Sequence, residues 1–171
     1  MMEKISAAKR EDGTAGLGKV FLQPRQVAEL AYAHGIVDAA DLATSVAVCF
    51  AESQAGIQAW HDNLGPDGVV LSRDVGLWQI NIPAAKIGTD AELALYSPDA
   101  NAAAMFALYR TRHFQPWAAY NSGVYLHDHY AGSAALALCN LAAERFNQAG
   151  ATLPLPMFST KDLRAKLATS I

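Results

Sequence analysis

Two carboxylates, Glu52 and Asp74, are the residues of this sequence best suited to do chemistry. Glu52 follows Phe50 and Ala51 at the end of an apolar run. Poor solvation there raises the pKa of a carboxyl group, because it disfavours the ionised form. A solvated glutamate is the alternative interpretation, but the C-terminal end of a helix is an unfavourable place for an anion. We therefore expect Glu52 to act as a proton donor near neutral pH.

Asp74 opens the stretch DVGLWQIN (74–81), which combines an acid, a glycine and two side-chain amides. Two carboxylates in different environments, one protonated and one charged, are the arrangement used in glycoside hydrolysis. A turn or cap role is the commoner alternative for an aspartate near glycine. Gly76 would let the backbone approach a sugar closely. Gln79 and Asn81 offer donors and acceptors that suit hydroxyl and N-acetyl groups.

Aromatic residues near these carboxylates are further candidates for substrate contact. Trp78 has two interpretations, a wall against the substrate or a packed core residue. We keep it among the substrate-binding candidates, although core packing is the commoner role. The segment 56–72 contains glycine, proline, asparagine and aspartate and is expected to be a loop. Within it Trp60, His61 and Asp62 are candidates for contact with a sugar or a peptide stem.

The elements that must position these groups are mainly helical. Apolar spacing and end signals predict helices over 24–35, from Asp38 or Asp41 to Ser53, over 97–113 and over 132–150. The second of these is apolar almost all round between Leu42 and Ala51, which is typical of a buried central helix. An aromatic, loop-rich segment is expected at 116–130. No internal repeat and no convincing hairpin is recognised, so the fold class is mainly α.

The chain is expected to hold one domain, because its 171 residues can bury a sizeable core. We expect a flexible arm at 1–21, a catalytic domain at 22–150 and a tail at 151–171. Within the arm, GTAGLGKV (13–20) lacks the final Ser or Thr of a phosphate-binding loop and follows no strand, so we interpret it as a linker.

Composition excludes several classes of function. A net charge of −3 offers no basic field for nucleic acid. The longest near-apolar run, 134–143, is too short to span a bilayer, so no membrane insertion is expected. The charged N-terminus has no apolar core typical of a signal peptide, so we expect synthesis in the cytosol. Cys49 and Cys139 are interpreted as small buried hydrophobes, with a disulfide possible but not implied.

A metal site is considered at HDH (127–129). His-x-His supplies two ligands without a clear third, so a solvated loop is favoured and we predict no metal and no cofactor. No Ser-His-Asp or Cys-His arrangement is evident either, and Cys49 is expected to be too buried to act as a nucleophile.

Three short motifs together resemble a known family. AES (51–53), DVGLWQIN (74–81) and AYNSG (119–123) occur in this order. Each is weak alone, but the ordered set resembles the lysozyme-like superfamily, above all the soluble lytic transglycosylases and the transglycosylase domains of phage tail proteins. The resemblance covers roughly residues 22–148, and it implies a helical lysozyme-like domain with a substrate groove.

The resemblance implies roles for individual residues. Glu52 matches the family's general acid and Ser53 the serine that follows it. Gln79 closes an element that resembles Gly-Leu-Met-Gln, with Trp78 in place of Met, and would line the groove. Tyr120 and Asn121 match the Ala-Tyr-Asn-Ala-Gly element, although Ser122 replaces its second alanine. In relatives that tyrosine points at the catalytic acid.

Asp74 departs from the transglycosylase pattern. Many transglycosylases carry a small or neutral residue at this place, whereas animal-type lysozymes carry their second catalytic carboxylate there. The resemblance therefore implies cleavage of the β-1,4 bond between N-acetylmuramic acid and N-acetylglucosamine in peptidoglycan. A transglycosylase that forms 1,6-anhydro ends is favoured. A muramidase that uses Glu52 and Asp74, or a non-catalytic peptidoglycan-binding module of a phage tail, are the alternatives.

The partners and location follow from the same resemblance. We expect glycan strands of peptidoglycan as the substrate and other phage tail proteins as further candidate partners. Without a signal peptide, the protein would reach the cell wall as part of a virion or as an endolysin released by a holin.

Overall fold

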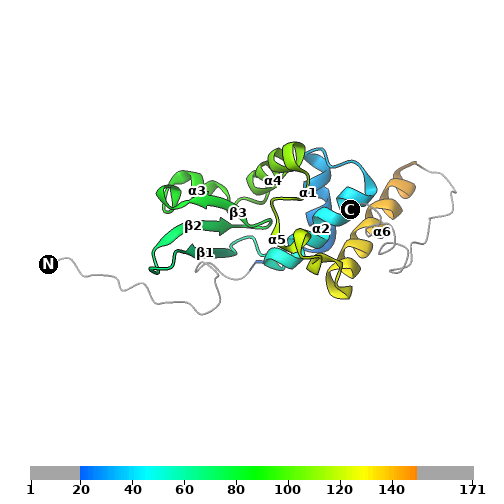
Figure 1. Ribbon diagram of the computed structural model, residues 1–171. Coiled ribbons are helices and arrows are strands. Elements are labelled where there is room, and N and C mark those ends of the chain that lie inside the picture. The colour runs from blue at the N-terminus through cyan, green and yellow to red at the C-terminus, as the bar shows by residue number, and fades with distance from the viewer. Residues whose placement is uncertain (1–19, 150–171) are drawn as a thin grey trace.

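The computed structural model describes the backbone of residues 20–149 and the side chains of residues 20–138. In this part the fold is mainly helical, as the sequence predicts, with one small sheet. The sheet and the short helix α3 form one end of the molecule, and the longer helices gather at the other (Figure 1). The elements, in chain order, are α1 Pro24–Ala33, α2 Ala39–Ser53, β1 Trp60–Leu64, β2 Val70–Val75, β3 Ile80–Pro83, η1 Ala84–Lys86, α3 Asp90–Ala94, α4 Pro98–Arg112, α5 Ala118–Asn121, η2 Val124–Leu126 and α6 Asp128–Ala149.

Local signals explain where the main helices begin. Proline occupies the first turn of both α1 and α4, where its missing N–H costs no hydrogen bond. Asp38 caps α2, because its side chain accepts the backbone N–H groups of Ala40 and Asp41. Ser97 holds the cap position of α4 without a side-chain cap bond. The sequence-predicted helices are therefore confirmed, apart from α6, which begins at Asp128 and so takes in most of the expected HDH loop.

The expectation of a loop at 56–72 without a hairpin is wrong. β1, β2 and β3 form an antiparallel sheet in that order. His61 pairs with Asp74, and Asp74 pairs with Asn81. Both faces of β1 and β2 carry polar residues, so these strands lack the apolar alternation that marks a strand in sequence.

The chain on the N-terminal side of α1 is tied to the segment after α2. Phe21 forms an isolated antiparallel bridge with Gly56, and Leu22 donates its N–H to the carbonyl of Ala55. The carbonyl of Val20 also accepts the N–H of Ile57, so the last two residues of the expected arm, Val20 and Phe21, contact the domain. Residues 1–19, with nearly all of the GTAGLGKV segment, and the tail at 151–171 lie outside the described residues, as does the side chain of Cys139.

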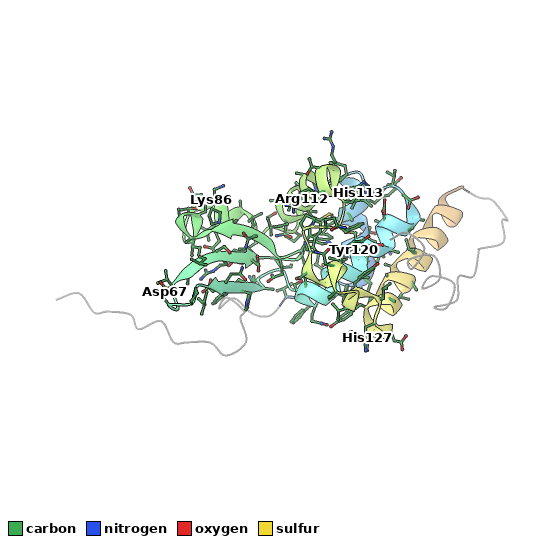
Figure 2. All side chains as sticks on the ribbon, viewed as in Figure 1. Asp67, Lys86, Arg112, His113, Tyr120 and His127 are labelled. Carbon is green, nitrogen blue, oxygen red and sulfur yellow. The ribbon has the colours of Figure 1, made fainter. Side chains whose placement is uncertain are left out.

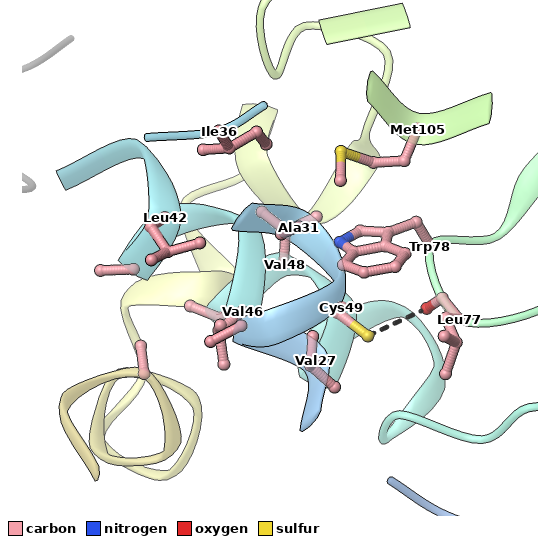
Figure 3. Close-up of a cluster of buried hydrophobic side chains, with 14 of the residues drawn as sticks. Val27, Ala31, Ile36, Leu42, Val46, Val48, Cys49, Leu77, Trp78 and Met105 are labelled. Carbon is pink, nitrogen blue, oxygen red and sulfur yellow. Dashed lines mark hydrogen bonds between the residues drawn. The ribbon is translucent and has the colours of Figure 1, made fainter. Parts of the chain in front are cut away.

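The core lies between the helices and the turn that joins β2 to β3. Every residue of α2 from Leu42 to Cys49 is buried, which confirms the predicted central helix. Trp78 and Leu77 enter this core from the β2–β3 turn and have no exposed surface (Figure 3). Cys49 is a free, buried thiol, as expected. Within residues 20–149, no helix has the length and apolar character needed to cross a membrane.

Candidate active site

Glu52 lies in the last turn of α2, beside the short helix α5. Its side chain is half-buried. One carboxyl oxygen, Oε1, accepts the backbone N–H of Ala119 at 2.9 Å. No other described residue hydrogen-bonds this carboxyl, so Oε2 is the oxygen that can carry and deliver a proton.

The electrostatic surroundings of Glu52 suit an acid. Burial raises the pKa of its carboxyl, the Ala119 N–H lowers it by favouring the anion, and the charge of Asp74 raises it again. The net direction is upward from the ordinary glutamate value. Burial and the negative charge of Asp74 both disfavour the ionised form of Glu52. Proteins keep a carboxylic acid protonated in this way.

Asp74 lies on β2, where its side chain is half-buried and held on both sides. Asn63 of β1 donates to Oδ2 at 2.9 Å, and Asn81 of β3 donates to Oδ1 at 2.7 Å. Both oxygens therefore act as acceptors, the role that an ionised carboxylate performs. The expected pairing of one protonated and one charged carboxylate stays a prediction.

The polar face of the sheet consists of His61 and Asn63 on β1, Ser72 and Asp74 on β2, and Asn81 on β3. Trp60 and Asp62 point to the opposite face, because side chains alternate along a strand. Of the three candidates from 56–72, only His61 shares the face of Asp74. The sequence interpretation missed Asn63 and Ser72. Had β2 been recognised, the two-residue spacing of Ser72 and Asp74 would have placed Ser72 on the face of Asp74.

Arg73 organises the opposite face. Its guanidinium forms a two-point ion pair with Asp62 at 2.6 and 3.0 Å and lies 4.3 Å from the centroid of the Trp60 ring. It also contacts Glu92 of α3 at 2.9 Å, and Glu92 is almost fully buried. These contacts fix β1, β2 and α3 to one another, and so Trp60 and Asp62 serve the sheet's structure on this face.

The turn between β2 and β3 explains the unusual composition of DVGLWQIN. Trp78 is fully buried, and its indole N–H donates to the carbonyl of Ser45 at 3.0 Å. Its own carbonyl accepts the indole N–H of Trp117 at 2.6 Å. The prediction that Trp78 contacts substrate is therefore wrong; the core alternative is correct, because the turn directs this ring inward between α2 and α4.

Gly76 does not offer its backbone to a sugar as predicted. It has φ +76, and a Cβ there would lie 2.2 Å from the amide nitrogen of Asn101 and 2.6 Å from the carbonyl of Leu95. Glycine is needed for close packing against the start of α4. Asn101, missed in the sequence because it lies within a helix, is fully buried and accepts the N–H of Trp78 at 2.9 Å.

The remaining substrate-binding candidates are engaged in contacts of their own. Ser53 donates to the carbonyl of Leu77 at 2.6 Å, which ties α2 to the β2–β3 turn. Gln79 has φ +47 and donates its amide to the carbonyl of Gly76 at 2.8 Å. Asn121 is exposed and donates to the carbonyl of Gln115 at 2.8 Å. None of these contacts tests whether the same side chains also bind substrate, so those roles stay predictions.

Tyr120 follows Ala119 directly, and its ring packs 5.2 Å from Tyr125 and 5.5 Å from Phe114, measured between centroids. Figure 2 shows it among the helices, away from the hairpin tip marked by Asp67. Its hydroxyl forms no hydrogen bond with any described residue, Glu52 included. The hydrogen bond to the acid comes instead from the preceding backbone N–H, which no sequence motif can reveal.

No group of three or more His, Cys, Asp or Glu side chains in the described part of the chain is arranged to hold a metal ion. His127 and His129 instead lie with their rings against Tyr130.

A comparison with protein families matches residues 28–119 to the family described as lysozyme-like domain. The chain belongs to this family. No curated protein matches the chain significantly. The matched range contains both carboxylates and the β2–β3 turn, and it ends at Ala119, whose N–H binds Glu52. Membership of the lysozyme-like domain family supports a peptidoglycan-related glycosidase activity, and it confirms the predicted superfamily and fold class.

Proposed function

We propose that this lysozyme-like domain cleaves the β-1,4 bond between N-acetylmuramic acid and N-acetylglucosamine as a lytic transglycosylase. The observation that carries the proposal is Glu52 itself, a half-buried carboxyl with a raised pKa and one oxygen that no described residue hydrogen-bonds. The charge of Asp74, whose two oxygens both accept hydrogen bonds, contributes to that raised pKa.

In the first step Glu52 acts as the acid. The proton on Oε2 passes to the glycosidic oxygen, the bond from that oxygen to C1 breaks, and its electron pair stays on the departing oxygen. Positive charge then develops at C1 and the ring oxygen. The N–H of Ala119, which already donates to Oε1 in the structure, would steady the new carboxylate of Glu52.

The negative charge of Asp74 would stabilise this oxocarbenium-like centre. Asn63 and Asn81 hold its carboxylate in place, so little reorganisation is needed as charge develops. In the second step the 6-hydroxyl of the muramic acid attacks C1 and gives its proton to Glu52, which now acts as the base. The product carries a 1,6-anhydro ring, and Glu52 regains its proton for the next cycle.

A muramidase is the second candidate, and the presence of Asp74 specifically favours it. Here water attacks C1 in place of the 6-hydroxyl, and the product has a reducing end. In a retaining hydrolase the second carboxylate attacks C1 directly before water does. Both candidates assign Glu52 the same first step and differ only in the group that attacks C1.

Mass spectrometry of the muropeptides released from purified peptidoglycan distinguishes the candidates. Glu52→Gln is the informative variant, because the amide oxygen can still accept the Ala119 N–H while the acidic proton is lost. We expect release to fall by about 10²-fold or more, the usual contribution of a general acid. Glu29→Gln is the matched control, since Glu29 is exposed on α1 and bonds only Arg25.

The masses of the products decide the chemistry. Products lighter by one water indicate the transglycosylase, whereas reducing-end products indicate the muramidase. Equal release by wild type and Glu52→Gln would contradict both. No release by either protein, with binding to peptidoglycan retained, would point to a binding module.

A further inference from the structure

Ser72 lies at the centre of the polar face of the sheet, between the two asparagines that hold Asp74. Its hydroxyl oxygen accepts from Asn63 at 3.2 Å and from Asn81 at 2.9 Å. The same two amide nitrogens donate to the two oxygens of Asp74. Four hydrogen bonds therefore join one residue of β1, two of β2 and one of β3 in a closed ring.

The charge of Asp74 fixes the orientation of both amides. An ionised carboxylate can only accept, so each asparagine must turn its nitrogen, not its oxygen, toward Asp74. Each amide nitrogen carries two hydrogens, and one goes to Asp74 while the other goes to Ser72. Without the Ser72 oxygen, the second hydrogen of each amide would lose its partner, and each side chain could rotate away.

We propose that Ser72 is the positioning residue of this site, which holds Asn63 and Asn81 so that each donates to one oxygen of Asp74. Ser72 acts through these amides and not on the substrate bond. The kinetic part of the inference rests on the proposed function, since it concerns the charge that Asp74 presents during glycan cleavage.

The ring also determines what the face offers to a sugar. Because both amide nitrogens are fully used, Asn63 and Asn81 present only their amide oxygens. The Ser72 oxygen accepts twice, and no described residue accepts the proton of its hydroxyl. Asn63, Asn81 and Ser72 therefore offer two acceptors and one donor beside Asp74, which suits the hydroxyl and N–H groups of a glycan. This refines the role of Asn81, which was expected to supply donors as well as acceptors.

The test compares Ser72→Ala with Ser72→Thr. Alanine removes the shared acceptor, whereas threonine keeps a hydroxyl and suits a strand. Leu71→Ala is the control, because Leu71 is the neighbour of Ser72 on β2 and its side chain is exposed. We expect kcat for muropeptide release to fall about tenfold in Ser72→Ala, which corresponds to about 1.4 kcal/mol, with KM changed much less. Threonine should restore most of the rate.

A second measurement does not depend on activity. Hydrogen exchange of the Asn63 and Asn81 side-chain amides, followed by NMR, should be slow in wild type and Ser72→Thr and faster in Ser72→Ala. Unchanged exchange in Ser72→Ala would overturn the proposal, as would faster exchange with unchanged kcat. If wild type releases no muropeptides, the proposed function fails, and the exchange measurement alone decides whether Ser72 positions the amides.

Discussion

At the scale of single residues, the two carboxylates differ because their partners differ. Glu52 is partly buried, and this burial outweighs the single backbone N–H on one of its oxygens, so its neutral form is favoured. Asp74 has an amide donor on each oxygen, so both of its oxygens act as acceptors. The pKa of Glu52 depends on both its own burial and the charge of its neighbour, which couples the two groups.

Asp74→Asn should shift the alkaline limb of the activity profile toward lower pH. The negative charge of Asp74 raises the pKa of Glu52, so its removal lets Glu52 lose its proton earlier as pH rises. The alkaline limb of a plot of kcat/KM against pH reports the pKa of Glu52 in the free enzyme. Asp67→Asn, at the exposed tip of the β1–β2 hairpin, should leave the limb unchanged. A limb that stays in place in Asp74→Asn would show that the two carboxylates do not interact.

At the scale of elements, the β2–β3 turn connects the sheet to the helices. In this turn, the backbone N–H of Trp78 donates to the side chain of Asn101 in α4. The carbonyl of Leu77 accepts the hydroxyl of Ser53 in α2. Asn101 also donates to the carbonyls of Val75 and Leu95, each at 2.9 Å. One buried amide therefore joins the end of β2, the turn and the segment before α4.

Asn101→Ala should destabilise the fold by about 3 kcal/mol, because two buried backbone groups and one partly buried backbone group lose their partner together. The free energy of unfolding, from urea titration, measures the loss. Thr111→Ala on the same helix is the control, since Thr111 is exposed and bonds only its own helix, and its cost should be small. A similar stability for both variants would mean that the turn is held by packing of Trp78 alone.

At the scale of the whole molecule, the raised pKa of Glu52 is a cost in stability. Between the ordinary glutamate pKa and the raised value, the folded protein keeps a proton that the unfolded chain has lost. Stability from this group therefore falls as pH rises through that window. The α2 helix holds an acid where the fold would be more stable without one, which is common at functional sites.

Glu52→Gln should therefore be more stable than wild type at about pH 7, and the two should converge near about pH 4, where glutamate is largely protonated in either state. Urea unfolding at both pH values gives the difference. Glu29→Gln, which changes an exposed carboxylate, should show no such dependence. A Glu52→Gln variant that is less stable than wild type at neutral pH would contradict the direction of the pKa shift.

The sequence by itself determined the four longer helices, apart from the start of α6, and the position of Glu52 at the end of α2. Proline and Asp38 at helix starts, glycine after α1 and the apolar run before Glu52 act through neighbours in the chain, so local patterns suffice to predict them. The same patterns predicted that Cys49 is buried. The order of the three motifs gave the superfamily, which the family match confirms.

Only the tertiary structure decided how the site is assembled. Both faces of β1 and β2 carry polar residues, so the sequence pattern does not show which side chains face the same way. The pairing of the strands shows that Asp74 and Asn63 share a face. Trp78 points inward because α2 and α4 supply partners for its N–H groups. The N–H that bonds Glu52 belongs to Ala119, far along the chain. Every residue except proline has a backbone N–H, so the residue type does not show which one donates. Long-range contacts of this kind depend on how the elements pack, and so no local pattern contains them.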